Sequence, residues 1–172
     1  MHDEIHTSAV SACFTGHRAL TESQLRQAVE AITRTIKLLL PKGITHYYAG
    51  GAVGLDMAAA VTVLNLKQQI PNLTLTMALP CRGHTQGWSR TDRALLSRIL
   101  ERADETVYVN DTYFRGCMQA RNRYMVDHSS YCLAYLTTNR GGTFNTVRYA
   151  EKKGVPVLYL NEDRRDDQLH FL

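Results

Sequence analysis

The sequence lacks the features of a membrane or secreted protein. Its 172 residues include no run of about 18 apolar residues, which excludes a conventional membrane-spanning helix. Residues 1–6 have neither the basic nor the apolar region of a signal peptide. We therefore expect a cytoplasmic protein with no membrane partner.

Paired cysteines and a strong charge of one sign are also missing. The four cysteines, Cys13, Cys81, Cys117 and Cys132, are scattered along the chain, so neither a metal site nor a disulfide framework is expected. Lys and Arg number 20 against 16 Asp and Glu, a net charge of +4. This balance mildly favours anionic partners but provides no dense basic arm for nucleic acid.

What is present is the composition of an ordinary globular protein, with 44% hydrophobic and 21% charged residues. The chain has no internal repeat, low-complexity segment or linker rich in proline and serine. We therefore predict one domain over residues 1–172, with its core at about residues 9–161.

Short β-branched and aromatic runs alternate with longer segments of helical period. The runs predict strands at 10–14, 45–49, 73–79, 106–109, 131–136 and 157–160. Thr21 and Gln24 form a capping-box pattern before the first helix, and further helices are predicted at 56–69, 89–102, 117–128 and 145–153. The predicted fold is α/β and Rossmann-like, a mainly parallel sheet of about six strands with helices on both faces. We expect the first strand to be central, with the fourth and fifth strands beyond it.

Most of the eleven glycines follow the predicted strands, and they include two separate Gly-Gly pairs. In an open parallel sheet, ligands bind at the carboxyl ends of the strands. Tight turns between strands and helices explain part of this pattern. The remainder predicts backbone that approaches a ligand closely beside helix N-termini, which favour anions.

Two early turns carry candidate binding residues. Thr15-Gly16-His17-Arg18 follows the first strand and offers two potential cations for a phosphate or carboxylate; the alternative is a solvated surface turn. Gly50, Gly51, Gly54 and Asp56 follow the second strand. Asp56 has two interpretations, a helix N-cap or an acceptor for a ribose hydroxyl.

Two later segments add to this set. Arg121 and Asn122 share a helical face with Met125. Gly141-Gly142-Thr143 opens a helix and is typical of an anion cradle. Trp88, in the loop after the third strand, is interpreted either as a wall for a base or as packing for the next helix.

Together these motifs resemble those of a known family. The motifs Thr15-Gly16-His17-Arg18, Gly50-Gly51-Ala52-Val53-Gly54-Leu55-Asp56, Arg121-Asn122-Arg123-Tyr124-Met125-Val126-Asp127 and Gly141-Gly142-Thr143, with Thr146 and Tyr149-Ala150, are similar to the YpsA/YoqJ-like branch of the SLOG superfamily. That superfamily joins the DNA-processing protein DprA to the Lonely Guy phosphoribohydrolases. The resemblance implies a Rossmann-like fold, found in bacteria and their phages, whose glycine loops bind a nucleotide-type ligand.

The candidate residues and the family resemblance together suggest three alternative functions. The first is a sensor or effector that binds a phosphate-bearing nucleotide or derivative through the thirteen candidates Thr15, Gly16, His17, Arg18, Gly50, Gly51, Gly54, Asp56, Arg121, Asn122, Gly141, Gly142 and Thr143. The second is a hydrolase of the N-glycosidic bond in nucleoside monophosphates, with Asp56, Arg121 and Asn122 as catalytic candidates. The third is single-stranded nucleic-acid binding. No cofactor is identified, and association into homo-oligomers stays open.

The hydrolase hypothesis meets a departure from the family pattern. The hydrolase branch has a Pro-Gly-Gly-x-Gly-Thr motif followed by a glutamate, whereas here Arg140 precedes a shorter Gly-Gly-Thr turn. Asn145 and Thr146 stand near the position of the acid, and Glu151 lies about two helical turns further on. We predict that a phosphate binds the backbone N–H groups of Gly142 and Thr143, with Arg18 or Arg121 as an added charge.

Overall fold

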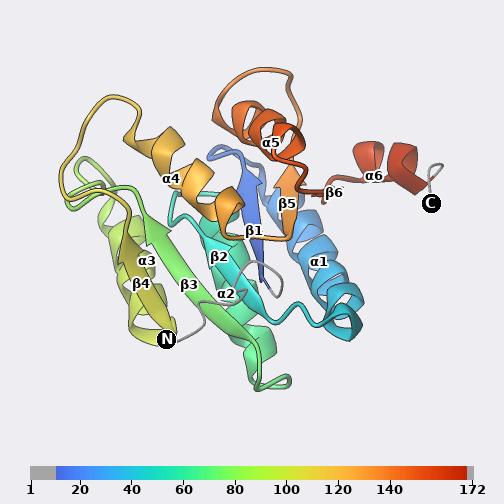
Figure 1. Ribbon diagram of the computed structural model, residues 1–172. Helices are drawn as coiled ribbons and strands as arrows, with labels where there is room; N and C mark the ends of the chain where they lie inside the picture. Colours follow the sequence, from blue (N-terminus) through green and yellow to red (C-terminus); the bar gives the residue numbers. More distant parts are fainter. Residues whose placement is uncertain (1–10, 170–172) are drawn as a thin grey trace, which may run out of the picture.

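The computed structural model describes the backbone of residues 11–169 and the side chains of residues 11–165. Its six strands form one parallel sheet in the order β4-β3-β2-β1-β5-β6 (Figure 1). The strands are β1 (Ser11–Gly16), β2 (His46–Ala49), β3 (Thr74–Leu79), β4 (Glu105–Tyr108), β5 (Tyr131–Tyr135) and β6 (Val157–Tyr159). The predicted Rossmann-like fold is confirmed, although residues 9 and 10 of the predicted core and first strand lie outside the described part.

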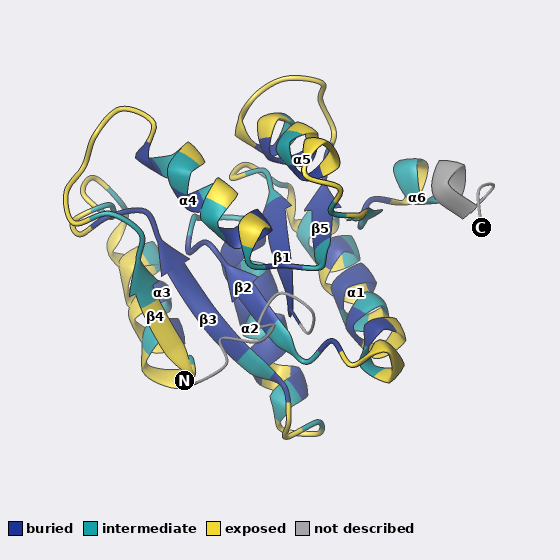
Figure 2. Cartoon of the chain, in the orientation of Figure 1, coloured by how far each residue is buried: buried dark blue, intermediate teal, exposed yellow. Residues whose placement is uncertain are grey.

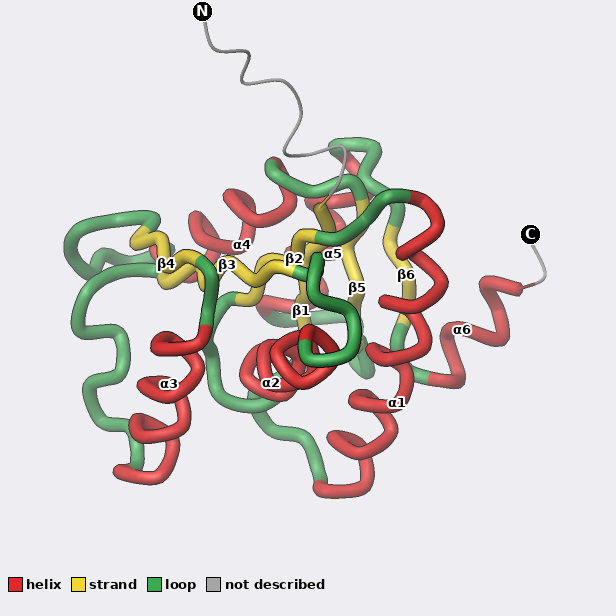
Figure 3. Tube along the Cα trace, turned by 90° about the horizontal axis from the view of Figure 1, so that it is seen from below, coloured by secondary structure: helices red, strands yellow, loops and turns green. Residues whose placement is uncertain are grey.

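Helices cover both faces of this sheet (Figure 3). One face carries α1 (Glu22–Leu39), α2 (Leu55–Lys67) and α3 (Arg90–Arg102), and the other carries α4 (Cys117–Asp127) and α5 (Gly142–Lys152). A short 3-10 helix, η2 (Leu40–Lys42), follows α1, and α6 (Glu162–Leu169) follows β6 at a segment that the sequence did not predict to be helical. Within the described residues, no helix combines the length and apolar character needed to cross a membrane.

The helix starts differ in a way that matters for the site. The predicted capping box begins α1: the Thr21 hydroxyl accepts from the Gln24 N–H at 3.1 Å, and the Gln24 side chain accepts from the Thr21 N–H at 2.9 Å. In contrast α2, α4 and α5 each begin after a glycine that has no side chain to cap them, at Gly54, Gly116 and Gly141 respectively. Three helices therefore begin with N–H groups that no N-cap side chain satisfies.

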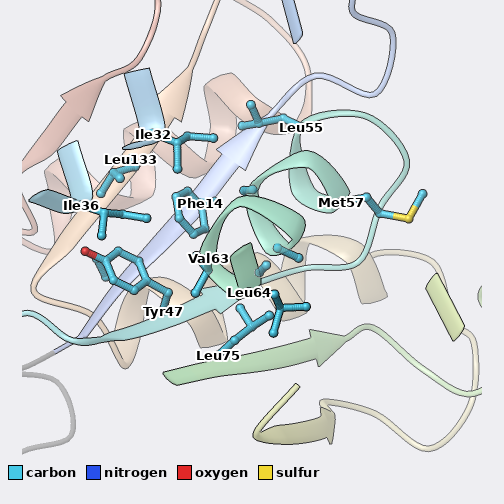
Figure 4. Close-up of a cluster of buried hydrophobic side chains, with 14 of the residues drawn as sticks. Phe14, Ile32, Ile36, Tyr47, Leu55, Met57, Val63, Leu64, Leu75 and Leu133 are labelled. Carbon is cyan, nitrogen blue, oxygen red and sulfur yellow. The ribbon is translucent and has the colours of Figure 1, made fainter. Parts of the chain in front are cut away.

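The main core lies between the sheet and the layer formed by α1 and α2. Phe14 on β1 stacks on Tyr47 on β2 with ring centroids 5.5 Å apart, and both pack beside Ile32 and Ile36 of α1 (Figure 4). Figure 2 shows β1, β2 and most of β3 as buried, with exposed residues on the outer helix faces, on β4 and in the loops before α4 and α5. Cys13 and Cys132 are fully buried and paired in register on β1 and β5, and both are free thiols.

The strand order corrects one expectation. The fourth strand was expected beyond β1 on the same side as the fifth, but β4 lies at the opposite edge, next to β3. The chain runs outward from β1 through β2, β3 and β4 and then returns to the other side of β1 as β5. The order thus reverses between β1 and β5, which places the loops after these two strands side by side.

Candidate functional site

A cavity of about 240 Å³ opens at the carboxyl edge of the sheet, where the strand order reverses. Nine of the thirteen predicted ligand-binding residues line it: Thr15, Gly16, His17, Arg18, Asp56, Arg121, Asn122, Gly142 and Thr143. The other four, Gly50, Gly51, Gly54 and Gly141, are not in its wall. Sequence segments far apart in the chain therefore meet at one place, as the parallel topology predicts.

The first turn of α5 forms one wall. The helix begins at Gly142, three residues earlier than the predicted start at 145. Gly141 precedes it with φ of 92°, a left-handed conformation that favours glycine. The N–H groups of Gly142, Thr143 and Phe144 have no acceptor within the helix, and the helix dipole favours negative charge here. This wall suits an anion.

Arg121 lies beneath the cavity as a buried cross-link. Its Nη1 donates to the carbonyl oxygens of Gly50 and of Ala78, the latter at 3.2 Å. Its Nη2 is 3.9 Å from Oδ2 of Asp56, and its Nε donates to Oδ1 of Asn122 at 2.8 Å. Burial lowers the pKa of Arg121, and the Asp56 carboxylate acts in the opposite direction. Most of the donors of Arg121 thus serve internal contacts.

Asp56 is the second residue of α2, and its interpretation as the helix N-cap is wrong because Gly54 occupies that position. Its Oδ2 accepts from the Ala52 N–H at 3.3 Å and faces Arg121. Burial raises the pKa of Asp56, while the charge of Arg121 acts to lower it. Among the described residues, Asp56 supplies the one carboxylate in the cavity wall, and Glu151 lies outside that wall with its side chain 54% exposed. A catalytic acid for glycosidic-bond hydrolysis therefore has Asp56 as its sole candidate here.

His17 and Arg18 play different parts. Nε2 of His17 accepts from the N–H of Thr137 at 3.0 Å, so this ring is neutral with its proton on Nδ1. Burial also lowers the pKa of His17, which corrects the expectation of a second cation. Arg18 is exposed, and its Cζ lies 5.9 Å from the ring centroid of Trp88. Trp88 itself packs against the main core and is absent from the cavity wall.

Three glycines, at the end of β1 and in the loop after β2, pack closely against protein atoms. A Cβ on Gly16 would lie 2.1 Å from Cδ2 of Leu55, and one on Gly50 would lie 2.5 Å from Cζ of Arg121. Gly54 has φ of 93°, and its Cβ would lie 2.4 Å from the Arg18 carbonyl oxygen. These positions need glycine because the loops approach one another closely, and the loops then hold the cavity residues in place.

Two wall residues were missed by the sequence analysis, Ala52 and Met118. Met118 lies one helical turn before Arg121, so the same three-residue spacing could have identified it. Ala52 lies between the flagged glycines but carries no polar group that would signal a role. Both add an apolar surface beside the polar groups.

Comparisons with known proteins place the chain in a family. The model of the family described as the YspA SLOG family (YpsA) matches residues 14–163. A UPF0398 protein of Staphylococcus epidermidis is 30% identical over 104 residues, covering 59% of this chain and 55% of the relative. The uncharacterised SPbeta prophage-derived protein YoqJ of Bacillus subtilis is 30% identical over 128 residues, covering 67% of this chain and 75% of the relative. This chain thus spans about half the length of the staphylococcal relative.

Solved structures agree on the fold. DNA processing protein A from Helicobacter pylori, described for its single-stranded DNA binding mode, superposes with a TM-score of 0.63 at 18% identity over 88% of this chain and 65% of that one. DNA processing protein A (DprA) from Streptococcus pneumoniae gives 0.63 at 16% identity over 87% of this chain and 49% of that one. With the family model matching most of its length, this chain belongs to the YpsA SLOG family.

Proposed function

We propose that this chain binds a nucleotide or nucleotide derivative in the cavity between the loops after β1 and β5, as a sensor or effector. The observation that carries this proposal is the convergence of Thr15, Arg18, Asn122 and Thr143 on the uncapped N-terminus of α5. The N–H groups of the first turn would hold a phosphate, and Arg18 would add a charge-assisted contact.

The rest of the wall suits the other parts of such a ligand. Among the described residues, Ala52 and Arg121 both contact Oδ2 of Asp56, which leaves Oδ1 as an acceptor for a sugar hydroxyl. Ala52 and Met118 provide apolar contacts for a sugar or base. This mixture of a few polar groups with an apolar surface is typical of small-molecule sites.

A thermal-shift series tests the proposal. Nucleoside mono- and diphosphates, ADP-ribose and NAD are compared with their unphosphorylated nucleosides. At least one phosphate-bearing compound is expected to raise the melting temperature, because a ligand at 100 times its Kd stabilises the folded state by about 2.7 kcal/mol. An unchanged melting temperature with every phosphate-bearing compound contradicts the proposal.

Gly142→Val provides the matched variant. The φ angle of Gly142 lies outside the left-handed region, and a Cβ there would meet nothing within 4 Å, so the fold should be kept. The larger side chain fills the space next to the first-turn N–H groups. We expect the variant to retain its melting temperature without ligand and to lose the ligand-induced rise.

Single-stranded nucleic-acid binding is the second candidate. The similar structure from Helicobacter pylori is described as a single-stranded DNA binder, and exposed Arg115, Arg140 and Arg148 lie on this chain. Binding through phosphates weakens steeply with salt. A labelled single strand that is retained at low salt and released at high salt supports this candidate, and no retention at low salt removes it.

A further inference from the structure

A crevice between α4 and α5 adjoins the cavity at Asn122, which lines both. The two helices lie side by side on one face of the sheet (Figure 1). Two hollows of about 30 Å³ and 510 Å³ lie along them and share Gln119, Arg123, Asn145 and Tyr149. The smaller hollow also shares Asn122 with the cavity. Through these shared lining residues, the cavity, the smaller hollow and the larger hollow adjoin one another from the first turn of α5, past Asn122, to Lys152.

The crevice is positively charged. Arg123, Arg148 and Lys152 line it, against the one acid Glu151, whose Oε2 is 4.0 Å from Nε of Arg148. Among the side chains that the structure describes, no carboxylate lies within 4.0 Å of the charged nitrogens of Arg123 or Lys152. Arg123 and Lys152 are therefore available to bind an anionic group.

Tyr149 holds one of these cations at the crevice. Cζ of Arg123 lies over the Tyr149 ring, 5.2 Å from its centroid. The Tyr149 hydroxyl donates to Oδ1 of Asp127 at 2.8 Å, which ties the ring from α5 to α4. This cation–π contact fixes the position of the guanidinium, whose N–H groups can donate to oxygen acceptors in the crevice.

Asn122 lines both the cavity and the crevice, and its contact with Arg121 fixes the orientation of its side-chain amide. Its Oδ1 accepts from Nε of Arg121, so its Nδ2 is left as a donor between the cavity and the crevice. We propose that the crevice is a second phosphate subsite, so that the ligand is a nucleotide with two phosphate groups. One phosphate lies at the first turn of α5, and the other contacts Arg123 and Arg148. This inference rests on the proposed function, whose cavity supplies the first phosphate site.

Two kinds of ligand have two such phosphate groups: a free nucleotide 3′,5′-bisphosphate and the 5′-phosphorylated end of a single strand. Isothermal titration calorimetry on the full chain compares adenosine 5′-monophosphate, adenosine 3′,5′-bisphosphate and a 5′-phosphorylated adenine dinucleotide. At least one of the two probes with a second phosphate is expected to bind tenfold or more tightly than the monophosphate. A dinucleotide that binds more tightly than the bisphosphate indicates a strand end, and the reverse order indicates a free nucleotide.

The double variant R123Q/R148Q isolates the crevice. In this variant, the probe with two phosphates should bind less than threefold more tightly than the monophosphate. The Kd of the monophosphate itself should change less than twofold. The matched control R34Q/K37Q removes two exposed charges from α1, on the opposite face of the sheet, and should keep the full advantage.

The outcomes separate this inference from the proposed function. If the monophosphate binds but neither larger probe binds more tightly, or if the advantage survives in R123Q/R148Q, the second subsite is overturned and the cavity proposal stands. If none of the three compounds binds, the second subsite is overturned, and the thermal-shift series decides the proposed function separately.

Discussion

The guanidinium of Arg121 and the carboxylate of Asp56 form a buried ion pair under the candidate site, with Nη2 and Oδ2 3.9 Å apart. Their side chains are 4% and 7% exposed. The pair joins α4 to the start of α2, and Arg121 also donates to the Gly50 carbonyl in the loop between β2 and α2. We infer that Arg121 positions the cavity wall.

Arg121→Leu should therefore destabilise the fold strongly. Removing one partner leaves the Asp56 carboxylate buried without its cation, which costs about 3–5 kcal/mol. The free energy of unfolding in urea measures this loss. In the double variant R121L/D56L both charges are absent, and the loss should be clearly smaller than in R121L. Equal losses in the two variants would show that the ion pair is not the cause.

His17 should make the stability depend on pH. Burial lowers the folded-state pKa of His17, and its Nε2 must stay unprotonated to accept from Thr137. In the unfolded chain the pKa of this histidine is ~6.5, so below that pH the unfolded state binds its proton more readily than the folded state does. The free energy of unfolding should therefore fall as pH decreases from about 6.5 through the folded-state pKa.

His17→Gln is the control for this effect, because its amide oxygen still accepts a hydrogen bond but does not titrate. Urea unfolding between about pH 7.5 and 5 should show a smaller loss of stability in the variant than in the wild-type chain, with the other histidines common to both. An NMR titration of the His17 ring gives its pKa directly, and a value at or above ~6.5 would contradict the prediction.

Substitution by alanine should destabilise the fold at one glycine of the cavity wall and leave it nearly unchanged at another. A Cβ on Gly16 would lie 2.6 Å from Cβ of Leu55, an atom that cannot move without its helix, whereas a Cβ on Gly142 meets nothing within 4 Å. Gly16→Ala should cost about 1–3 kcal/mol through overpacking, and Gly142→Ala should leave stability nearly unchanged. Urea unfolding of both variants makes the comparison, and similar losses would refute the packing argument.

The sequence was sufficient for the fold and for most of the cavity wall, because those follow from local patterns. Apolar runs and glycines identify parallel strands and their carboxyl ends, and topology alone then brings Thr15, Asn122 and Gly142 together. The position of β4 was mispredicted because strand order depends on how the crossovers pack, which no single segment encodes.

The internal contacts of the site could not be predicted from the sequence for a similar reason. Arg121 could be expected to face the cavity, but its partners Gly50 and Asp56 come from the loop after β2 and the first turn of α2. The neutral state of His17 depends on Thr137, from the loop after β5. A polar residue on a predicted site face therefore needs its three-dimensional partners before it can be assigned to ligand or to structure.

Asn122→Asp tests the polarity of the candidate site without changing its shape. The Asn122 amide accepts from Arg121 through Oδ1 and presents Nδ2 as a donor. An aspartate keeps the acceptor for Arg121 but puts a charged oxygen where the donor was, and this oxygen repels a phosphate. The Kd of the phosphate-bearing nucleotide found in the thermal-shift series should rise at least tenfold by calorimetry. Asn65→Asp makes the same charge change at an exposed position of α2 outside the cavity wall and should leave the Kd within about twofold. Equal affinities for N122D and the wild-type chain would place the phosphate away from Asn122.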